Sequence, residues 1–497
     1  MKKIKFLSFG SFHRSFRGSS RGSIHRSFSG SSHWFPRVIY ISFIFFFTLS
    51  APAEKIENEI RSLLAKQTKQ YSFSLRGMDG QELIHINGDK ALAPASIAKT
   101  VSTGCSLNAL GPQYQFETLF GYRGKLEGDT LKGDLIIHGG GDPSLVIEDL
   151  REVIEKIRYV HGIKKIQGDL IFDVSYFGVP FLKMAEGFEG DNGRSFAADL
   201  TAVSMNQNSF SFWVTADHRN NLKTRAVTLP AQVLNLEVIN QTKVGSGNSI
   251  AVSYDPNKQK ATLSGQIRSD SEPKGIYRSV EDSYEYYTKL IHRLWLDTGG
   301  EWAKIKFVIE TKSIKSTLLW KNSSKPLAKI LMDINKLSLN LGAEMTFLAA
   351  GIADGNQPAT YEKSMVLLKS CLKDFSIDPN GIILTNASGL SREALIKTSA
   401  LTQFIYRMQK SPYAPEYLSS FSLLGIDGTA KSRLLPFAGR ARVKTGSLRG
   451  VRSITGVLTS KKQEPLTFAL ILNGVESNDG ETKKTEDLIL EKILQTY

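Results

Sequence analysis

The character of the sequence changes twice along the chain, and this change constrains the fold more than any other feature. Residues 54–111 and 313–497 carry mainly helical apolar spacing with a few strands, whereas residues 112–312 consist of short β-prone runs broken by Gly, Asn and Asp. A block of different character inside a longer pattern is typical of a nested insert. We therefore predict one domain built from both flanks, with residues 112–312 inserted between them.

Chain length also favours several modules, because single cores rarely grow beyond roughly 250–300 residues and this chain has 497. Inside the insert, Gly133–Ile137 and Gly168–Phe172 both begin with Gly-Asp-Leu-Ile and resemble strands, and residues 147–160 between them show amphipathic helical spacing. We predict that the insert contains two modules, about 112–137 plus 209–312, and about 138–208.

The two flanks predict an α/β (α+β) domain in which helices flank a sheet. The N-terminal flank shows a helix over 54–67, strands over 71–75 and 83–86, and a helix that follows Ser96 and ends near Gly111. The C-terminal flank shows helices over 327–336, 339–352 and 361–372, then one hairpin formed by 442–458 and 465–473, and a closing helix over 481–494.

Residues 1–53 have the three-part layout of a secretory signal. They contain eight Lys or Arg and no acid, followed by the apolar run 38–49 and then Ala51-Pro52-Ala53. Since a spanning helix needs about 20 apolar residues and this run has twelve, we predict a cleaved signal with cleavage near Ala53. A permanent anchor is the less favoured alternative.

Charge argues against a nucleic-acid partner once the leader is removed. The formal net charge then falls from +15 to +7, because eight of the 63 basic residues and none of the 48 acidic residues are lost. No dense basic cluster or groove-reading motif follows. A mildly basic exported protein could associate peripherally with anionic envelope polymers, although ordinary solubility charge explains the same excess.

The cysteines and histidines do not predict a metal site. Only Cys105 and Cys371 are present, which excludes a disulfide-stapled scaffold and a Cys-based zinc site, and a single bridge between them stays open. The histidines of the mature chain lack ligand spacing and are predicted to be surface or core residues: His85, His138, His161, His218 and His292. Neither a metal nor a cofactor is predicted.

Ser96-Ile97-Ala98-Lys99 carries the first candidate chemistry. A hydroxyl and an amine three residues apart share one helix face and can hydrogen-bond. Serine needs a nearby base, and lysine can be that base where burial or another cation keeps it largely neutral. We predict Ser96 as nucleophile and Lys99 as base, with the Ser96 N–H facing a developing oxyanion. Ordinary helix surface is the alternative, because four-residue patterns often match by chance.

Two more polar patterns lie in the C-terminal flank. Lys444 and the hydroxyls of Thr445 and Ser447 could bind a carboxylate, while Gly446 lets a substrate backbone approach; a basic β-edge is the alternative. At the mouth of an apolar helix, Ser338 and Asn340 form a Ser-x-Asn pattern, in which Ser338 could relay a proton and Asn340 could hold a substrate amide. The same pattern also begins at Ser106, Ser204 and Ser246, but these lie on the nucleophile's own helix or in the insert.

In this order the three patterns form the signature of penicillin-binding proteins and class A β-lactamases. The 242 residues from Ser96 to Ser338 far exceed the spacing of a compact β-lactamase. The chain resembles the class C low-molecular-mass penicillin-binding proteins, the D-alanyl-D-alanine carboxypeptidase/endopeptidases of the penicillin-binding protein 4 type. Further matching segments extend the resemblance over residues 54–497: Gly139–Pro143, Asp173–Phe177, Ser204–Phe210, Ser388–Arg392 and Asp427–Thr429.

The resemblance implies a serine transpeptidase/β-lactamase-like domain and a periplasmic enzyme that cleaves D-alanyl bonds in peptidoglycan stem peptides or cross-links. It implies β-lactams as covalent inhibitors, catalytic roles for Ser338 and Lys444, and no cofactor. It also implies that Asp191, beside Phe196 and Leu448, receives the amine end of the stem. A β-lactamase-like hydrolase and an inactive peptidoglycan-binding module are the competing interpretations.

The chain departs from the family pattern at two places. Leu339 replaces the usual aspartate between Ser338 and Asn340, and Asn386-Ala387 replaces Asp-Gly ahead of Ser388. Neither replaced residue performs the acyl chemistry, so we still expect activity.

Overall fold

The computed structural model describes residues 54–184, 195, 198–217, 223–230, 236–255, 257–475 and 479–497. The predicted leader, Asp191 and Phe196 lie outside these residues. Among the helices of the described segments, none combines the length and the apolar character needed to cross a membrane.

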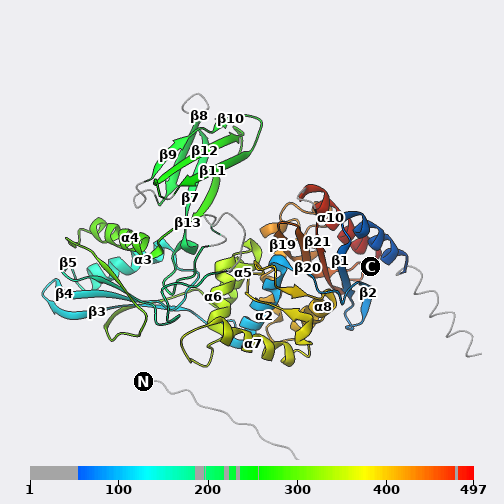
Figure 1. Ribbon diagram of the computed structural model, residues 1–497, viewed down its shortest axis with the longest axis horizontal. Coiled ribbons are helices and arrows are strands. Elements are labelled where there is room, and N and C mark those ends of the chain that lie inside the picture. Colours follow the sequence, from blue (N-terminus) through cyan, green and yellow to red (C-terminus); the bar gives the residue numbers. More distant parts are fainter. Residues whose placement is uncertain are drawn as a thin grey trace, which may run out of the picture. The chain divides into compact units, whose positions relative to one another are not determined.

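Both ends of the chain contribute to one six-stranded antiparallel sheet, in the order β18-β19-β20-β21-β1-β2 (Figure 1). Its strands are β1 (Gln70–Arg76), β2 (Glu82–Ile86), β18 (Ser422–Leu423), β19 (Ala441–Leu448), β20 (Val451–Thr459) and β21 (Pro465–Asn473). β1 pairs with β21, with Phe73 opposite Leu470. The predicted α/β domain with an antiparallel sheet is confirmed.

Helices cover both faces of this sheet, as the alternation along β21 requires. Leu466, Phe468, Leu470 and Leu472 pack in one cluster with the helix over residues 54–67 and with α10 (Asp479–Thr496). Ala469 and Ile471 belong to the opposite cluster, which includes α2 (Lys99–Leu110) and α8 (Thr398–Met408). The sheet is therefore the middle layer of three.

The predicted helices of the C-terminal flank are present as α5 (Leu327–Leu337), α6 (Asn340–Ala350), α7 (Tyr361–Asp374) and α10. Two helices, α8 and α9 (Ala414–Ser419), were not predicted. Short elements connect them: η5 (Pro379–Gly381), β16 (Ile382–Ile383), β17 (Leu395–Ile396), η6 (Gly428–Ala430) and η7 (Leu435–Phe437).

The prediction of a single closing hairpin is wrong. The stretch 442–458 contains a turn at Arg449 and Gly450, which separates β19 from β20, so three consecutive strands form a meander. Gly450 has a φ of 76°, the left-handed conformation that glycine adopts without a steric penalty.

The middle block forms a mixed sheet in the order β14-β6-β4-β3-β15, with β5 paired to β4. Its strands are β3 (Glu117–Glu127), β4 (Thr130–His138), β5 (Lys165–Ile166), β6 (Leu170–Asp173), β14 (Phe307–Glu310) and β15 (Thr317–Ser323). The two Gly-Asp-Leu-Ile runs lie side by side as parallel strands, with Leu135 opposite Leu170. The helices of this block are α3 (Ile147–Glu155), continued by the π-turn η2 (Lys156–Val160), and α4 (Ser283–Asp297), which was not predicted.

The described residues between 206 and 279 form two further sheets. One has the order β13-β7-β8, from β7 (Ser209–Asp217), β8 (Lys223–Leu229) and β13 (Lys274–Ser279), preceded by η4 (Asn206–Asn208). The other contains β9 (Glu237–Asn240), β10 (Lys243–Val244), β11 (Ser249–Asp255) and β12 (Lys260–Ile267). Because β15 pairs with β3, the sheet of the middle block continues to Ser323. The module boundaries predicted from the sequence stay a prediction.

Candidate active site

Ser96 and Lys99 lie at the junction of two helical elements. Ser96 belongs to the 3₁₀ turn η1 (Ala95–Ala98), and α2 begins directly after it at Lys99. The Lys99 Nζ lies 2.9 Å from the Ser96 Oγ. Every residue of α2 from Lys99 to Leu107 is buried, whereas Ser96 is half-buried. The pair therefore combines an accessible hydroxyl with an amine that is removed from water.

Three oxygens surround the Lys99 Nζ. Besides the Ser96 Oγ, it contacts the Asn340 Oδ1 at 2.7 Å and the Ser388 carbonyl oxygen at 2.8 Å. Burial lowers the pKa of Lys99 to about 7, and the negative charge of Glu344 partly opposes this shift. At neutral pH a substantial fraction of Lys99 is thus the free amine.

The opposite wall comes from the junction of α5 and α6. Ser338 lies between the two helices in a left-handed conformation, with φ 61° and ψ 40°, and α6 begins two residues later at Asn340. The Ser338 Oγ accepts a hydrogen bond from the Lys444 Nζ at 2.9 Å. The short Ser-Leu-Asn segment therefore reaches both lysines, Lys99 through Asn340 and Lys444 through Ser338.

Lys444 and its neighbours lie on β19. Burial, followed by the charge of Lys99, holds the pKa of Lys444 well below its usual range. Thr445 is half-buried and donates to the Thr429 Oγ1 at 2.8 Å, while Ser447 is exposed and accepts from Arg452 at 3.2 Å. Leu448 packs against the small cluster of Ala93, Ala95 and Val451.

Gly446 is required by the protein's own packing. A Cβ here would lie 2.2 Å from the Ser453 Oγ and 3.0 Å from both the Pro94 carbonyl oxygen and the Ser96 N. β18 pairs with β19 only at Arg442 and Val443, so the edge of β19 from Lys444 onward lies beyond its partner strand. This strand edge runs beside the nucleophile turn.

Sequence reasoning missed Glu344, and it named the loop around Ser388 only as part of the family resemblance, without its contact with Lys99. Glu344 is fully buried on α6 and accepts from the Ala387 N–H and the Ser388 N–H, each at 2.8 Å, and from the Tyr361 hydroxyl at 3.0 Å. Burial raises the pKa of Glu344, and these hydrogen bonds oppose the shift. The carboxyl thereby positions the Ser388 carbonyl that contacts Lys99. A lone acid within the apolar sequence of α6 was the available signal.

Asn386 stands where the family pattern has an aspartate, and nearby backbone groups satisfy its side chain. Asn386 is buried, its Oδ1 accepts from the Gly389 N–H at 3.0 Å, and its Nδ2 donates to the Met184 carbonyl at 3.3 Å. An asparagine oxygen therefore closes this turn without a carboxylate.

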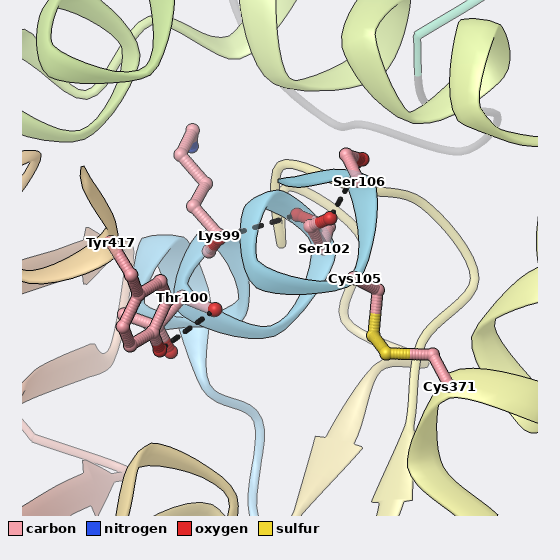
Figure 2. The surroundings of a disulfide bond; sticks show 7 residues. All are labelled: Lys99, Thr100, Ser102, Cys105, Ser106, Cys371 and Tyr417. Atoms are coloured by element: carbon pink, nitrogen blue, oxygen red, sulfur yellow. Dashed lines mark hydrogen bonds between the residues drawn. A yellow bond between two sulfur atoms is a disulfide. The ribbon is translucent and has the colours of Figure 1, made fainter. Parts of the chain in front are cut away.

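The open question of the cysteines is answered by a disulfide. Cys105 and Cys371 are bonded, which ties α2 to α7 (Figure 2). Farther toward the start of α2, the Tyr417 hydroxyl donates to the Thr100 carbonyl at 3.0 Å. The helix that carries Lys99 is thus anchored near its start, at Thr100, and at its middle, at Cys105.

Comparisons with known proteins identify the family of the chain. The model of the D-Ala-D-Ala carboxypeptidase 3 (S13) family matches residues 59–493. The D-alanyl-D-alanine carboxypeptidase DacB of Haemophilus influenzae is 28% identical over 413 residues, which covers 81% of this chain and 85% of that protein.

Solved structures give the same result. The crystal structure of penicillin-binding protein 4 from Haemophilus influenzae has a TM-score of 0.72 and 26% identity, and covers 88% of this chain and 99% of that one. Its complex with a β-lactam matches with a TM-score of 0.68, 25% identity and the same coverage. The resemblance inferred from the sequence is confirmed: the chain belongs to the D-Ala-D-Ala carboxypeptidase 3 (S13) family and is a serine-type carboxypeptidase of that family.

Proposed function

We propose that Ser96 attacks the carbonyl of a D-alanyl bond in peptidoglycan, with Lys99 as the base that accepts its proton. One observation carries this assignment. Two of the three oxygens around the Lys99 Nζ, the Asn340 Oδ1 and the Ser388 carbonyl, can only accept hydrogen bonds. A neutral amine has two N–H donors and one lone pair, so these oxygens take both donors. The lone pair is left for the Ser96 hydroxyl.

The reaction then follows the usual course of acyl transfer by serine. The Ser96 Oγ forms a bond to the D-alanyl carbonyl carbon while its proton passes to Lys99. The C–N bond breaks, the leaving amine takes a proton, and water later hydrolyses the acyl-enzyme. Ser338 and Lys444, which are hydrogen-bonded to each other at 2.9 Å, provide the proton path to the leaving group.

Substrate would lie along the edge of β19. An extended peptide can pair with an exposed strand edge, which fixes its backbone beside the nucleophile. Lys444, Thr445 and Ser447 supply an amine and two hydroxyls that can donate hydrogen bonds to the terminal carboxylate, and the Ser96 and Ser447 N–H groups form the oxyanion hole. β-Lactams would enter the same site, as the β-lactam complex of the Haemophilus influenzae protein suggests.

The site accommodates either of two leaving groups. Free D-alanine leaves in carboxypeptidation, and a cross-linked stem leaves in endopeptidation, but the carbonyl attacked is the same. We propose that Asp191, with Phe196 and Leu448, binds the amine end of the stem. An Asp191→Ala variant should then lose activity selectively on diaminopimelate-containing peptides, and unchanged selectivity would refute this part.

The residues ahead of the catalytic domain suggest where the enzyme works. Their basic stretch, apolar run and Ala51-Pro52-Ala53 favour export to the periplasm. In that compartment the enzyme would meet peptidoglycan stem peptides. The net charge of +7 that remains without residues 1–53 would be enough for peripheral association with anionic envelope polymers.

Incubation of the purified protein with intact sacculi, followed by mass analysis of the released products, tests the assignment. We expect D-alanine or uncross-linked stems to be released by the parent protein and by Ser106→Ala, a matched serine on the same helix. The Ser96→Ala variant should release neither. Binding of muropeptides without any product would favour an inactive binding module instead.

A further inference from the structure

A second array of serine, histidine and aspartate lies in the sheet of the middle block. His138 and Asp173 are the last residues of the neighbouring parallel strands β4 and β6, and they lie opposite each other. The His138 Nδ1 is 2.7 Å from the Asp173 Oδ2, and its Nε2 is 2.7 Å from the Oγ of Ser316, which directly precedes β15. The ends of two strands and the residue ahead of a third thus bring together side chains that are far apart in the sequence.

The partners of Asp173 determine which imidazole nitrogen carries the proton. Burial opposes its ionisation, but hydrogen bonds from His138, from Ser175 and from the Ile314 N–H outweigh burial and lower the pKa of Asp173 to about 2. An ionised carboxylate only accepts, so the His138 Nδ1 must donate to it. In neutral His138 the Nε2 is then the acceptor, and the Ser316 hydroxyl donates to it. This is the tautomer that a general base requires.

The array opens into a cavity. Its volume is about 920 Å³, and all three residues contribute to its wall. Polar side chains, including Tyr114, Gln115 and Lys315, share the rest of the wall with apolar ones such as Leu119 and Leu318. Such a mixed lining suits a sugar-like ligand, which presents both hydroxyl groups and apolar C–H faces. His138 is about one-fifth exposed and Asp173 is buried, so the base is accessible while its orienting carboxylate is shielded.

We propose that Ser316, His138 and Asp173 form a second hydrolytic site, which cleaves small acyl esters of sugar-like alcohols. The distances meet the requirement that the nucleophile lies within hydrogen-bonding reach of the base, and the base within reach of its orienting group. This proposal rests on side chains outside the Ser96 site and is independent of the function proposed there.

The chemistry needs no further reactant than water. The Ser316 Oγ bonds to the acyl carbon, and its proton passes to the His138 Nε2. The ester C–O bond breaks, and the same proton goes to the departing alkoxide, which leaves as the alcohol. His138 then takes a proton from water, whose oxygen attacks the acyl-serine. The bond between the acyl carbon and the Ser316 Oγ breaks, the carboxylic acid is released, and His138 returns its proton to the Ser316 Oγ.

The test uses the full chain with the first nucleophile removed, because Ser96 would react with the same reagents. A fluorophosphonate probe should label the Ser96→Ala protein, and peptide mapping should locate the adduct at Ser316. The same protein should hydrolyse p-nitrophenyl acetate and an O-acetylated glucose. Adding Ser316→Ala or Asp173→Asn should lower both rates at least about 100-fold, the usual contribution of a positioned base.

Two controls keep the outcome decisive. Adding Ser323→Ala, an exposed serine at the opposite end of β15 from Ser316 and outside the cavity wall, should change neither labelling nor hydrolysis. The single variant Ser316→Ala should still form a penicillin adduct at Ser96, which shows that it is folded. Absence of probe from Ser316, or esterase rates that Ser316→Ala leaves unchanged, would overturn the proposal without touching the Ser96 assignment.

Discussion

Two buried lysines face the nucleophile region, and their surroundings give them different tasks. Lys99 loses hydration on burial but gains the field of Glu344, and the balance places its pKa at about 7. Lys444 is also buried, and it experiences the positive charge of Lys99 instead, so its pKa lies well below the usual range. Lys99 is the one of these two lysines that contacts the Ser96 Oγ, and a pKa of about 7 lets its charge change near neutral pH.

The first prediction concerns the pH dependence of acylation. Below pH about 7 the added proton occupies the Lys99 lone pair, so the acylation rate constant should fall about tenfold per pH unit and should level off above it. Stopped-flow measurements with a chromogenic cephalosporin would give this profile. A Lys99→Arg variant, whose guanidinium stays charged, should be slow at every pH; a parent profile without an acid limb would argue against Lys99 as base.

The second prediction concerns Glu344. Its negative charge raises the pKa of Lys99, so Glu344→Gln should move the acid limb of the acylation profile to lower pH. The amide also replaces one acceptor oxygen that faces a backbone N–H, so the rate plateau should fall as the Ser388 carbonyl shifts. Tyr361→Phe removes only the third hydrogen bond and serves as the control. If Glu344→Gln lowers the rate plateau but leaves the acid limb at the same pH, the role of Glu344 is purely structural.

Among the secondary-structure elements, α2 must keep its position because its first residue, Lys99, contacts the Ser96 Oγ. It carries Lys99 and is tied to α7 by the Cys105–Cys371 bond across 266 residues (Figure 2). We expect Cys105→Ser with Cys371→Ser to lower the free energy of unfolding by about 2–5 kcal/mol. Urea denaturation measures this loss. Reductant should destabilise the parent protein to a similar extent and leave the double variant unchanged; equal stability of both proteins would contradict the tether.

Short sequence motifs were enough to name some residues of the candidate site. Ser96, Lys99, Asn340 and Lys444 could be named because hydroxyls, amines and amides recur at characteristic places relative to helices and strands. Glu344 could not, because its role depends on the folding of the Ser388 loop against α6. The helices α4 and α8 were missed since their many aromatic and β-branched residues weaken helical propensity, and tertiary packing overrides it.

At the scale of the whole molecule, both ends of the sequence complete the catalytic sheet. Arg433, in the segment that leads to β19, is buried against α10, with its Nη2 3.0 Å from the Glu486 Oε2 and 2.6 Å from the Asp487 Oδ1. Arg433→Ala should lower the free energy of unfolding by about 3–5 kcal/mol, because it leaves the buried Glu486 carboxylate with only the more distant Arg452, at 3.8 Å. The pair Arg433→Met with Glu486→Gln should lose less, and thermal denaturation would show the difference; equal losses would contradict the ion pair.

Mapping a penicillin adduct would show whether Ser96 is the acylated residue and whether Lys99 is its base. Intact-protein mass analysis after exposure to benzylpenicillin should show one persistent adduct, and peptide mapping should place it on Ser96. The adduct should be absent from Ser96→Ala and form far more slowly in Lys99→Arg. An adduct on another residue, or none on a folded parent protein, would contradict the account, and rapid release would favour a β-lactamase.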